Sequence, residues 1–332
     1  MALRRIEILG PVAYREHLVQ LVRACDPVSS WTQCDAESCE VRALLESGRV
    51  EPLMNDLESF LALHEDAAIQ VAVLDVKAIL PRLPKPEETK NDAGTRLPKR
   101  ISRDELSTEI YKGAEFDAIY VVTVILSTIV AAIGLLRNSP ATVIGAMVIA
   151  PLMGPNVALA LATNLGDGEL ARRALRTSMI GLATAVTSAA LIALFLPPID
   201  PEVPGEIHAR VVPHWSDVIL ALASGVAGAL AYTTGVSSSL VGVMVAVALL
   251  PPTVVATMLA VQGNDAAVNA GLLVATNIVG VILAAVTTFR IQGIYPRTWW
   301  DKKRTKRATV WALSFLFALL AVFTALLVLR AR

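Results

Sequence analysis

The chain has almost no ionisable residues inside its long apolar runs. Of 332 residues, 55% are hydrophobic and 17% are charged, and the mean hydropathy is +0.58. This composition is too apolar for one soluble domain, so it predicts a membrane protein. No Asp, Glu, Lys, Arg or His lies well inside a predicted span, which argues against a simple intramembrane proton relay.

The sequence also lacks the signatures of catalysis and of nucleotide binding. It contains no P-loop, no glycine-rich nucleotide fingerprint, no Ser/His/Asp arrangement and no HExxH pattern. An intramembrane enzyme acting on lipid would need acid–base groups that the predicted spans lack. We therefore expect a protein that is not an enzyme, that has no cofactor and that binds no nucleic acid.

Cysteine is scarce, and Cys25, Cys34 and Cys39 all lie near the N-terminus. An odd number of cysteines in a cytoplasmic segment favours small buried thiols over a disulfide framework. With His17 they make four possible metal ligands, but no CxxC pair supports a zinc site. We therefore predict no metal site.

No signal peptide is visible, because the opening "MALRRIEILG" lacks the apolar core of such a segment. This start predicts a cytoplasmic N-terminus.

Residues 1–80 combine short strand patterns with helical ones. Strands are expected at 3–9, 28–34, 38–45 and 68–76, and helices at 10–25 and 50–64, with Pro52 in the first turn of the second helix. The order βαββαβ predicts an α+β ferredoxin-like domain. Such a domain either binds a small regulatory ligand or serves packing and oligomerisation alone. Because one sheet face is left open for another subunit, we expect a homo-oligomer.

Residues 81–116 connect this domain to the membrane region. Residues 81–100 are rich in proline and charge and lack periodicity, which predicts an extended or flexible linker. Residues 101–116 carry a helix-start signal, with Ser102 as N-cap and Glu105 completing a capping box. Their apolar residues recur at helical spacing, so this segment is either an amphipathic interfacial helix or a plain connecting helix.

Seven apolar runs approach the length of about 20 residues that a transmembrane helix needs. They are 118–136, 141–162, 174–196, 218–232, 238–261, 266–289 and 309–329. Lys and Arg gather before the first run, after the second and after the sixth, which predicts that these joints face the cytoplasm and that the C-terminus lies outside. The basic joint after the sixth run either anchors this topology or binds anionic lipid. The lipid bilayer is thus an expected partner.

The membrane region contains an internal repeat. Residues 117–196 and 217–290 form two halves, separated by an outer loop at 197–216 and followed by a basic joint and a final helix at 291–332. The stretch "GAMVIAPLMGP" of the first half aligns with "GVMVAVALLPP" of the second, and "TSMIG" aligns with "TNIVG" at nearly the same spacing. Since each half holds three spans, an odd number, the second half enters the membrane from the opposite side. The predicted fold class is a polytopic α-helical membrane protein with inverted three-helix repeats and a ferredoxin-like soluble domain.

Proline and glycine interrupt equivalent helices in the two halves. Proline removes a backbone donor and clashes with the carbonyl four residues back, and lipid cannot satisfy the polar groups that this frees. Such breaks at corresponding positions of inverted repeats indicate a transporter site, whereas a packing kink is the alternative interpretation. The candidate substrate path comprises Asn138, Ser139, Pro151, Gly154, Pro155, Asn156, Pro251, Pro252, Thr253 and Asn277.

These patterns predict a membrane transporter or channel for an unknown small solute or ion. Uncharged side chains and freed carbonyls can coordinate a cation or bind a small solute, and half-helix N-termini favour an anionic group. The alternative function is a membrane-anchored metabolite sensor or scaffold, in which the soluble domain binds the ligand.

The motif "NSPATVIGAMVIAPLMGP" at 138–155, with "GVMVAVALLPP" and "ATNIVG" downstream, resembles a bacterial membrane family catalogued as domain of unknown function 389. The resemblance covers roughly residues 117–289. It implies a multi-pass protein of the bacterial inner membrane without an established substrate, and it supplies no catalytic residues. The matching positions are Asn138, Ser139, Pro140, Gly145, Met147, Pro151, Gly154, Pro155, Gly242, Pro251, Pro252 and Asn277.

Overall fold

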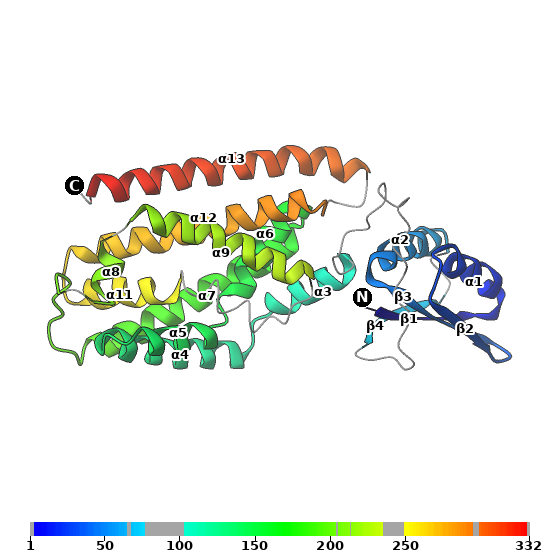
Figure 1. Cartoon of the computed structure of the whole chain (residues 1–332), viewed down its shortest axis with the longest axis horizontal. Coiled ribbons are helices and arrows are strands. Elements are labelled where there is room, and N and C mark those ends of the chain that lie inside the picture. Colours follow the sequence, from blue (N-terminus) through cyan, green and yellow to red (C-terminus); the bar gives the residue numbers. More distant parts are fainter. Residues whose placement is uncertain are drawn as a thin grey trace, which may run out of the picture. The chain divides into compact units, whose positions relative to one another are not determined.

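The chain divides into two compact units, Met1–Leu106 and Ser107–Arg332 (Figure 1). The computed structural model describes residues 3–64, 68–76, 103–203, 205–212, 214–234, 249–294 and 299–330. The predicted linker at 81–100, together with Ser102 of the predicted capping box, lies outside these residues.

The N-terminal unit is a four-stranded antiparallel sheet with two helices. Its elements are β1 (Leu3–Pro11), the 3-10 helix η1 (Val12–Tyr14), α1 (Arg15–Ala24), β2 (Ser29–Cys34), β3 (Ser38–Glu46), α2 (Ser47–Leu63) and β4 (Gln70–Val76). The strands lie in the order β2-β3-β1-β4, and each neighbouring pair is antiparallel. The expected strands and helices are therefore present in the expected order.

Alternation along β1 builds one side of this unit's core. Ile6 and Ile8 are fully buried, whereas their neighbours Arg5 and Glu7 are only partly covered. Leu18 of α1 and Leu57 of α2 pack in the same apolar cluster. Side chains alternate every two residues along the strand and recur about every 3.6 residues along a helix, so these residues lie on the surfaces where sheet and helices face each other.

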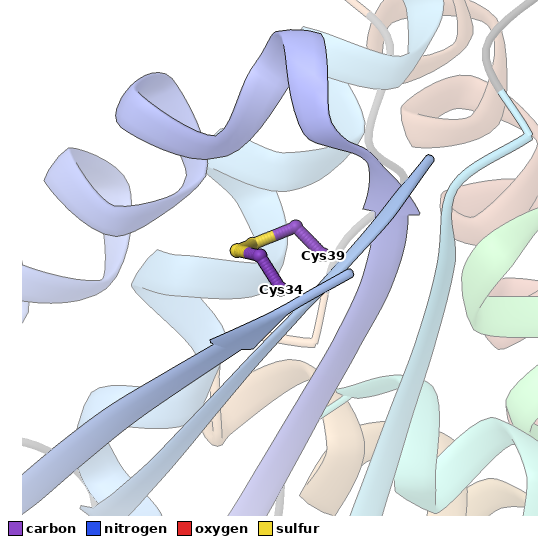
Figure 2. The surroundings of a disulfide bond; sticks show 2 residues. All are labelled: Cys34 and Cys39. Atoms are coloured by element: carbon purple, nitrogen blue, oxygen red, sulfur yellow. A yellow bond between two sulfur atoms is a disulfide. The ribbon is translucent and has the colours of Figure 1, made fainter. Parts of the chain in front are cut away.

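Two details of the N-terminal unit differ from the expectations. The helix α2 begins at Ser47, so Pro52 lies inside it and not in its first turn. The expectation that all three cysteines are free thiols is also wrong. Cys34 and Cys39 form a disulfide, while Cys25 is free (Figure 2).

The β2–β3 hairpin explains this disulfide. Cys34 and Cys39 are direct partners in the strand ladder, with Cα atoms 4.0 Å apart. Their separation along the chain is five positions, and the turn between them is closed by a hydrogen bond from Asp35 N to Ser38 O of 2.8 Å. Composition alone carries no information about this strand register, which is why the pairing was missed.

The C-terminal unit is helical. It contains the end of α3 (Arg103–Gly113), then α4 (Ala118–Leu136), α5 (Pro140–Ile149), α6 (Met153–Leu165), α7 (Gly168–Ala193), α8 (His208–Val211), α9 (Trp215–Thr234), α11 (Leu250–Val261), α12 (Ala266–Ile291) and α13 (Trp299–Arg330).

Among the described residues, four helices are long and apolar enough to cross a membrane, namely α4, α7, α9 and α12. The bent pair α5 and α6 adds a fifth if it counts as one span. The chain is therefore a multi-pass membrane protein. The predicted fifth span at 238–261 falls partly on residues 235–248, which lie outside the described residues. The predicted seventh span overlaps α13, in which the apolar part Ala312–Leu326 is shorter than a full span, so the number seven stays a prediction.

Two opposite ends of the C-terminal unit can be defined by their contacts. At the α8 end, Gln262 after α11 donates from Nε2 to Pro197 O at 3.0 Å, which joins the chain after α7 to the turn before α12. At the α3 end, the Asn164 amide near the end of α6 donates to Ile294 O after α12. The helices α7 and α12 therefore run in opposite directions. So do α4 and α9, because Asn138 after α4 accepts from Glu206 N before α9, and Gly113 before α4 lies beside Tyr232 near the end of α9.

Candidate functional site

The predicted helix break at "GAMVIAPLMGP" is present. The helix α5 ends at Ile149, α6 begins at Met153, and their axes are bent by 56°. Ala150 has an extended backbone with φ −67° and ψ 120°, because a residue that precedes proline is sterically restricted from the helical region. Pro151 itself supplies no N–H for the helical ladder. The local sequence alone therefore accounts for the break.

The corresponding helix of the second half also begins at proline. Leu250 starts α11, and Pro251 and Pro252 occupy its first turn, where a missing N–H breaks no helical bond. Both prolines are buried, whereas Pro151 is half-buried. The chain before Leu249 lies outside the described residues, so only the C-terminal side of this predicted break is seen.

Asn156 and Thr253 occupy equivalent places in the first turns of α6 and α11. Asn156 Nδ2 donates to Leu152 O at 2.7 Å, and Thr253 Oγ1 donates to Leu249 O at 2.8 Å. Both side chains are buried. Each therefore satisfies a carbonyl at the start of its own helix, which is the local role that polar residues often take in membrane helices.

The end of α3 lies directly against the first break. A Cβ atom added at Gly154 would lie 2.5 Å from Gly113 O, so the two backbones are in contact. Thr177 Oγ1 on α7 donates to Ala114 O at 2.8 Å in a buried hydrogen bond. In turn, Tyr120 Oη on α4 donates to Thr177 O at 3.3 Å. Backbone contact and buried hydrogen bonds thus bring α3, α4, α6 and α7 together at this point.

A charged group completes the site where α7 begins. Tyr111 Oη donates to Asp167 Oδ2, and Asp167 Oδ1 accepts the backbone N–H groups of Glu169 and Leu170 at 3.0 Å each. The hydrogen bond to Asp167, with burial, raises the pKa of Tyr111 to about 12. Burial alone raises the pKa of Asp167, but the Tyr111 and backbone hydrogen bonds outweigh it and hold this pKa below its usual value.

Asn138 and Ser139 lie at the other end of α5. Asn138 has a left-handed backbone with φ 49°, and its Oδ1 accepts from Glu206 N at 2.8 Å. Ser139 Oγ lies 2.9 Å from Thr142 Oγ1 in the first turn of α5. Since α5 has 10 residues, these two side chains are about 15 Å along the helix from Pro151. The structure does not bring them to the break.

Asn277 is buried in the middle of α12, at 5% exposure. It follows Thr276, whose hydroxyl donates to Leu272 O at 2.8 Å. The helix α12 packs against α6, the second half of the broken pair. The predicted path residues therefore separate into those at the start of α6, those at the start of α11, one residue on α12, and two residues near the α8 end.

Several residues at the break were not singled out as site residues from the sequence. Tyr111, Gly113 and Tyr120 lie in or beside α3 and α4, and nothing in their local pattern indicates a contact with α6 or α7. Thr177 and Gly181 were recognised only as part of the repeated "TSMIG" stretch. A Cβ added at Gly181 would lie 2.2 Å from Tyr120 Oη, which shows why a glycine stands there.

A separate cleft of about 640 Å³ lies in the N-terminal unit. It is lined by Tyr14, His17, Leu21, Asp56, Ser59, Phe60, Leu63 and His64. The His17 ring stacks on Phe60 with centroids 4.6 Å apart, and the His64 ring is 4.3 Å from Phe60. In the part of the chain that the structure describes, no three His, Cys, Asp or Glu side chains are placed to hold a metal ion.

The geometry therefore defines a multi-pass membrane protein whose proline-broken helix is covered by the end of a preceding helix. The family described as domain of unknown function (DUF389) matches residues 147–283, which confirms the resemblance inferred from the motifs. An uncharacterized protein of Methanocaldococcus jannaschii, MJ0678, is 29% identical over 298 residues, which cover 88% of this chain and 91% of that protein. An alignment of that extent includes part of both units. No solved structure matches.

Proposed function

We propose that this protein is a transporter or channel for a small solute or ion, with its path between the proline-initiated first turns of α6 and α11. In this proposal the two halves are inverted repeats. The half-helix ends and the polar groups near Asn156, Thr253 and Asn277 provide the binding surface, as at the broken helices of known secondary transporters.

The matched helix lengths support the repeat. The helices α4 and α9 have 19 and 20 residues, α6 and α11 have 13 and 12, and α7 and α12 have 26 each. Corresponding helices α4 and α9 run in opposite directions, and so do α7 and α12. A second half that enters the membrane from the other side has this arrangement.

Reciprocal packing is the observation that carries the proposal. The helix α6 packs against α7 of its own half and against α12 of the other, while α11 packs against α12 and against α7. Each proline-initiated helix is therefore held between the long helices of both halves. A relative movement of the halves would change the surroundings of both helix starts together, which is what alternating access requires.

The finer details of organisation belong to the same proposal. The strand order β2-β3-β1-β4 with antiparallel neighbours supports a ferredoxin-like N-terminal domain. The distribution of Lys and Arg supports a cytoplasmic N-terminus. A bacterial inner membrane is what the family resemblance implies. A homo-oligomer, in which another subunit covers the open face of the sheet, is part of the same proposal.

The test is flux through the purified protein in liposomes, measured for a panel of alkali cations, halides and small neutral solutes. The double variant Pro151→Ala and Pro251→Ala is expected to abolish flux of whichever probe the wild type conducts, with expression unchanged, because the freed backbone groups become helical. Pro140→Ala is the matched control, since Pro140 starts α5 away from the break. Unchanged flux in the double variant would refute the assigned path.

The cleft in the N-terminal unit favours the sensor as a second candidate. Its volume of about 640 Å³ and its aromatic lining suit a small ligand. A metabolite that raises the Tm of the full-length wild type but not that of His17→Ala supports this function, since binding to the folded state stabilises it. Glu16→Ala, an exposed neighbour outside the cleft, is the control. A ligand that stabilises all three equally binds elsewhere.

A further inference from the structure

The end of α3 makes three contacts of different chemistry around one helix break. Gly113 touches the backbone of Gly154 at the start of α6, and Ala114 O accepts a buried hydrogen bond from Thr177 on α7. Tyr111 donates to Asp167, which lies between α6 and α7. Four consecutive residues therefore bind both the start of the broken helix and the turn after it.

The same turn also reaches the second half of the membrane unit. A Cβ atom added at Gly113 would lie 3.5 Å from the hydroxyl oxygen of Tyr232. Tyr232 lies near the end of α9 and is 9% exposed. The end of α3 is thus in contact with helices of both halves, although it belongs to neither.

The residues that join α5 to α6 form the joint of the break. Ala150 to Leu152 are outside both helices, and Leu152 packs beneath α7, since a Cβ added at Gly181 would lie 3.0 Å from Leu152 Cδ2. A rotation of α6 about this joint, away from α3, would separate Gly154 from Gly113. The position of α3 and the angle of the break are therefore coupled by direct contact.

We propose that the end of α3 and the residue after it, Tyr111 to Ala114, act as a latch that holds the first helix break closed. Separation of this latch from α6 and α7 then regulates access to the path. This inference rests on the proposed function for what the access serves. Because α3 is the segment through which the N-terminal unit is joined to the membrane unit, the latch is also where a signal from that unit would act.

The test follows the accessibility of the break and does not need a transported substrate. In a background with Cys25, Cys34 and Cys39 replaced by serine, Ala150→Cys provides a reporter thiol, since Ala150 is 4% exposed. Its alkylation by a water-soluble maleimide is measured in membranes. The latch predicts slow alkylation in this background and an acceleration of about 2- to 10-fold in Thr177→Val, the change expected when one buried hydrogen bond is lost.

Two further variants and one control complete the test. Gly154→Ala and Tyr111→Phe are expected to accelerate alkylation as well, since each removes a different latch contact. Thr187→Val is the matched control on the same helix, because its exposed hydroxyl donates to Ala183 O of the same helix at 2.8 Å. Equal rates in all four variants and the parent would overturn the latch.

Flux measurements on the same variants separate the two proposals. Faster alkylation together with faster flux of the conducted probe supports both. Faster alkylation with no flux of any probe in any variant supports the latch and contradicts the transport function. Faster flux with unchanged alkylation overturns the latch and leaves transport standing.

Discussion

The two proline-initiated helices have similar sequences but different surroundings. Pro151 is half-buried, and the turn that follows it is covered by the end of α3 through Gly113. Pro251 and Pro252 are buried, and the residues around them, such as Leu250 and Val254, belong to the apolar core shared by α4, α7 and α11. Ala150 and Leu152 at the first break belong to the same core, so the start of α6 is covered by the core and in addition by the end of α3, whereas the start of α11 is covered by the core.

This difference assigns different roles to the two helix starts. A helix held by core packing moves only with the helices that enclose it, because the loss of close packing is unfavourable. The contact between the start of α6 and the end of α3 is an addition to such packing, and it is lost when only a few contacts break. We therefore expect the start of α6 to be the adjustable part and the start of α11 to be the fixed part.

The largest effect is expected from Gly154→Ala. Its new Cβ would overlap Gly113 O at 2.5 Å, and overpacking of this kind lowers the free energy of unfolding by about 1–3 kcal/mol. Gly145→Ala is the control in the preceding helix, because a Cβ there meets no atom within 4 Å. It should be neutral or stabilise by up to about 1 kcal/mol. Thermal unfolding in detergent measures both, and equal Tm shifts would contradict the contact.

A smaller effect is expected when the carbonyl-capping side chains are removed. Asn156→Leu and Thr253→Val each delete one buried hydrogen bond, at a cost of about 1 kcal/mol. Thr253→Ser retains the hydroxyl, and Asn156→Thr replaces the amide by a hydroxyl that can reach the same carbonyl, so both should avoid most of the loss. If the two helix starts are equivalent, chemical denaturation gives similar losses in the free energy of unfolding for Asn156→Leu and Thr253→Val, and similar recoveries for Asn156→Thr and Thr253→Ser. A loss at one start only would show that the similarity is confined to sequence.

The Tyr111–Asp167 pair predicts a pH dependence at the first break. The pKa of Tyr111 is raised to about 12, so its contribution to stability is fully present below about pH 10, the unfolded value, and is lost as pH approaches 12. The pKa of Asp167 is lowered, so its contribution is present above about pH 4 and is lost as pH falls further. Because both groups are only partly buried, water screens the pair and the effect is small.

Stability measured against pH in wild type and Tyr111→Phe tests this pair. The variant should lose the alkaline decline assigned to Tyr111 and show a weaker acidic decline. Parallel profiles in the two proteins would mean that the hydrogen bond does not affect folding.

The smallest effect is expected at Asn138. Glycine adopts the left-handed backbone of this residue without strain, so Asn138→Gly removes only the bond to Glu206 N, which is exposed. The free energy of unfolding should change by about 0.5 kcal/mol or less. Flux of the conducted probe should be unchanged, because Asn138 lies at the α8 end. A large loss of flux would extend the path along the whole of α5.

The contrast between the two helix starts also shows how far sequence reasoning reaches. The break between α5 and α6 follows from Pro151 and from the restriction on Ala150, both of which act within a few residues. The strands and helices of the N-terminal unit follow in the same way from apolar residues that recur every two residues in strands and every three or four residues in helices. The bounds of α4 were predicted to the residue, since a run of apolar side chains between Asp117 and Arg137 has clear limits.

Contacts between segments far apart in the chain could not be predicted. The Cys34–Cys39 pairing depends on the register of β2 and β3. The roles of Tyr111, Gly113 and Thr177 depend on where α3 ends relative to α6 and α7. Asn138 and Ser139 were grouped with Pro151 because they belong to one sequence motif. The helix α5 lies between them, so they are at opposite ends of that helix.

The sequence by itself determined that this is a multi-pass membrane protein with a helix broken at Pro151 and an N-terminal unit of alternating strands and helices. These features arise from composition, periodicity and the backbone chemistry of proline, all of which act locally. Only the tertiary structure decided that α6 and α11 are each enclosed by helices of both halves, and that the end of α3 lies on the first break. Those contacts depend on the packing of small residues between helices, which a single sequence does not encode in any one segment.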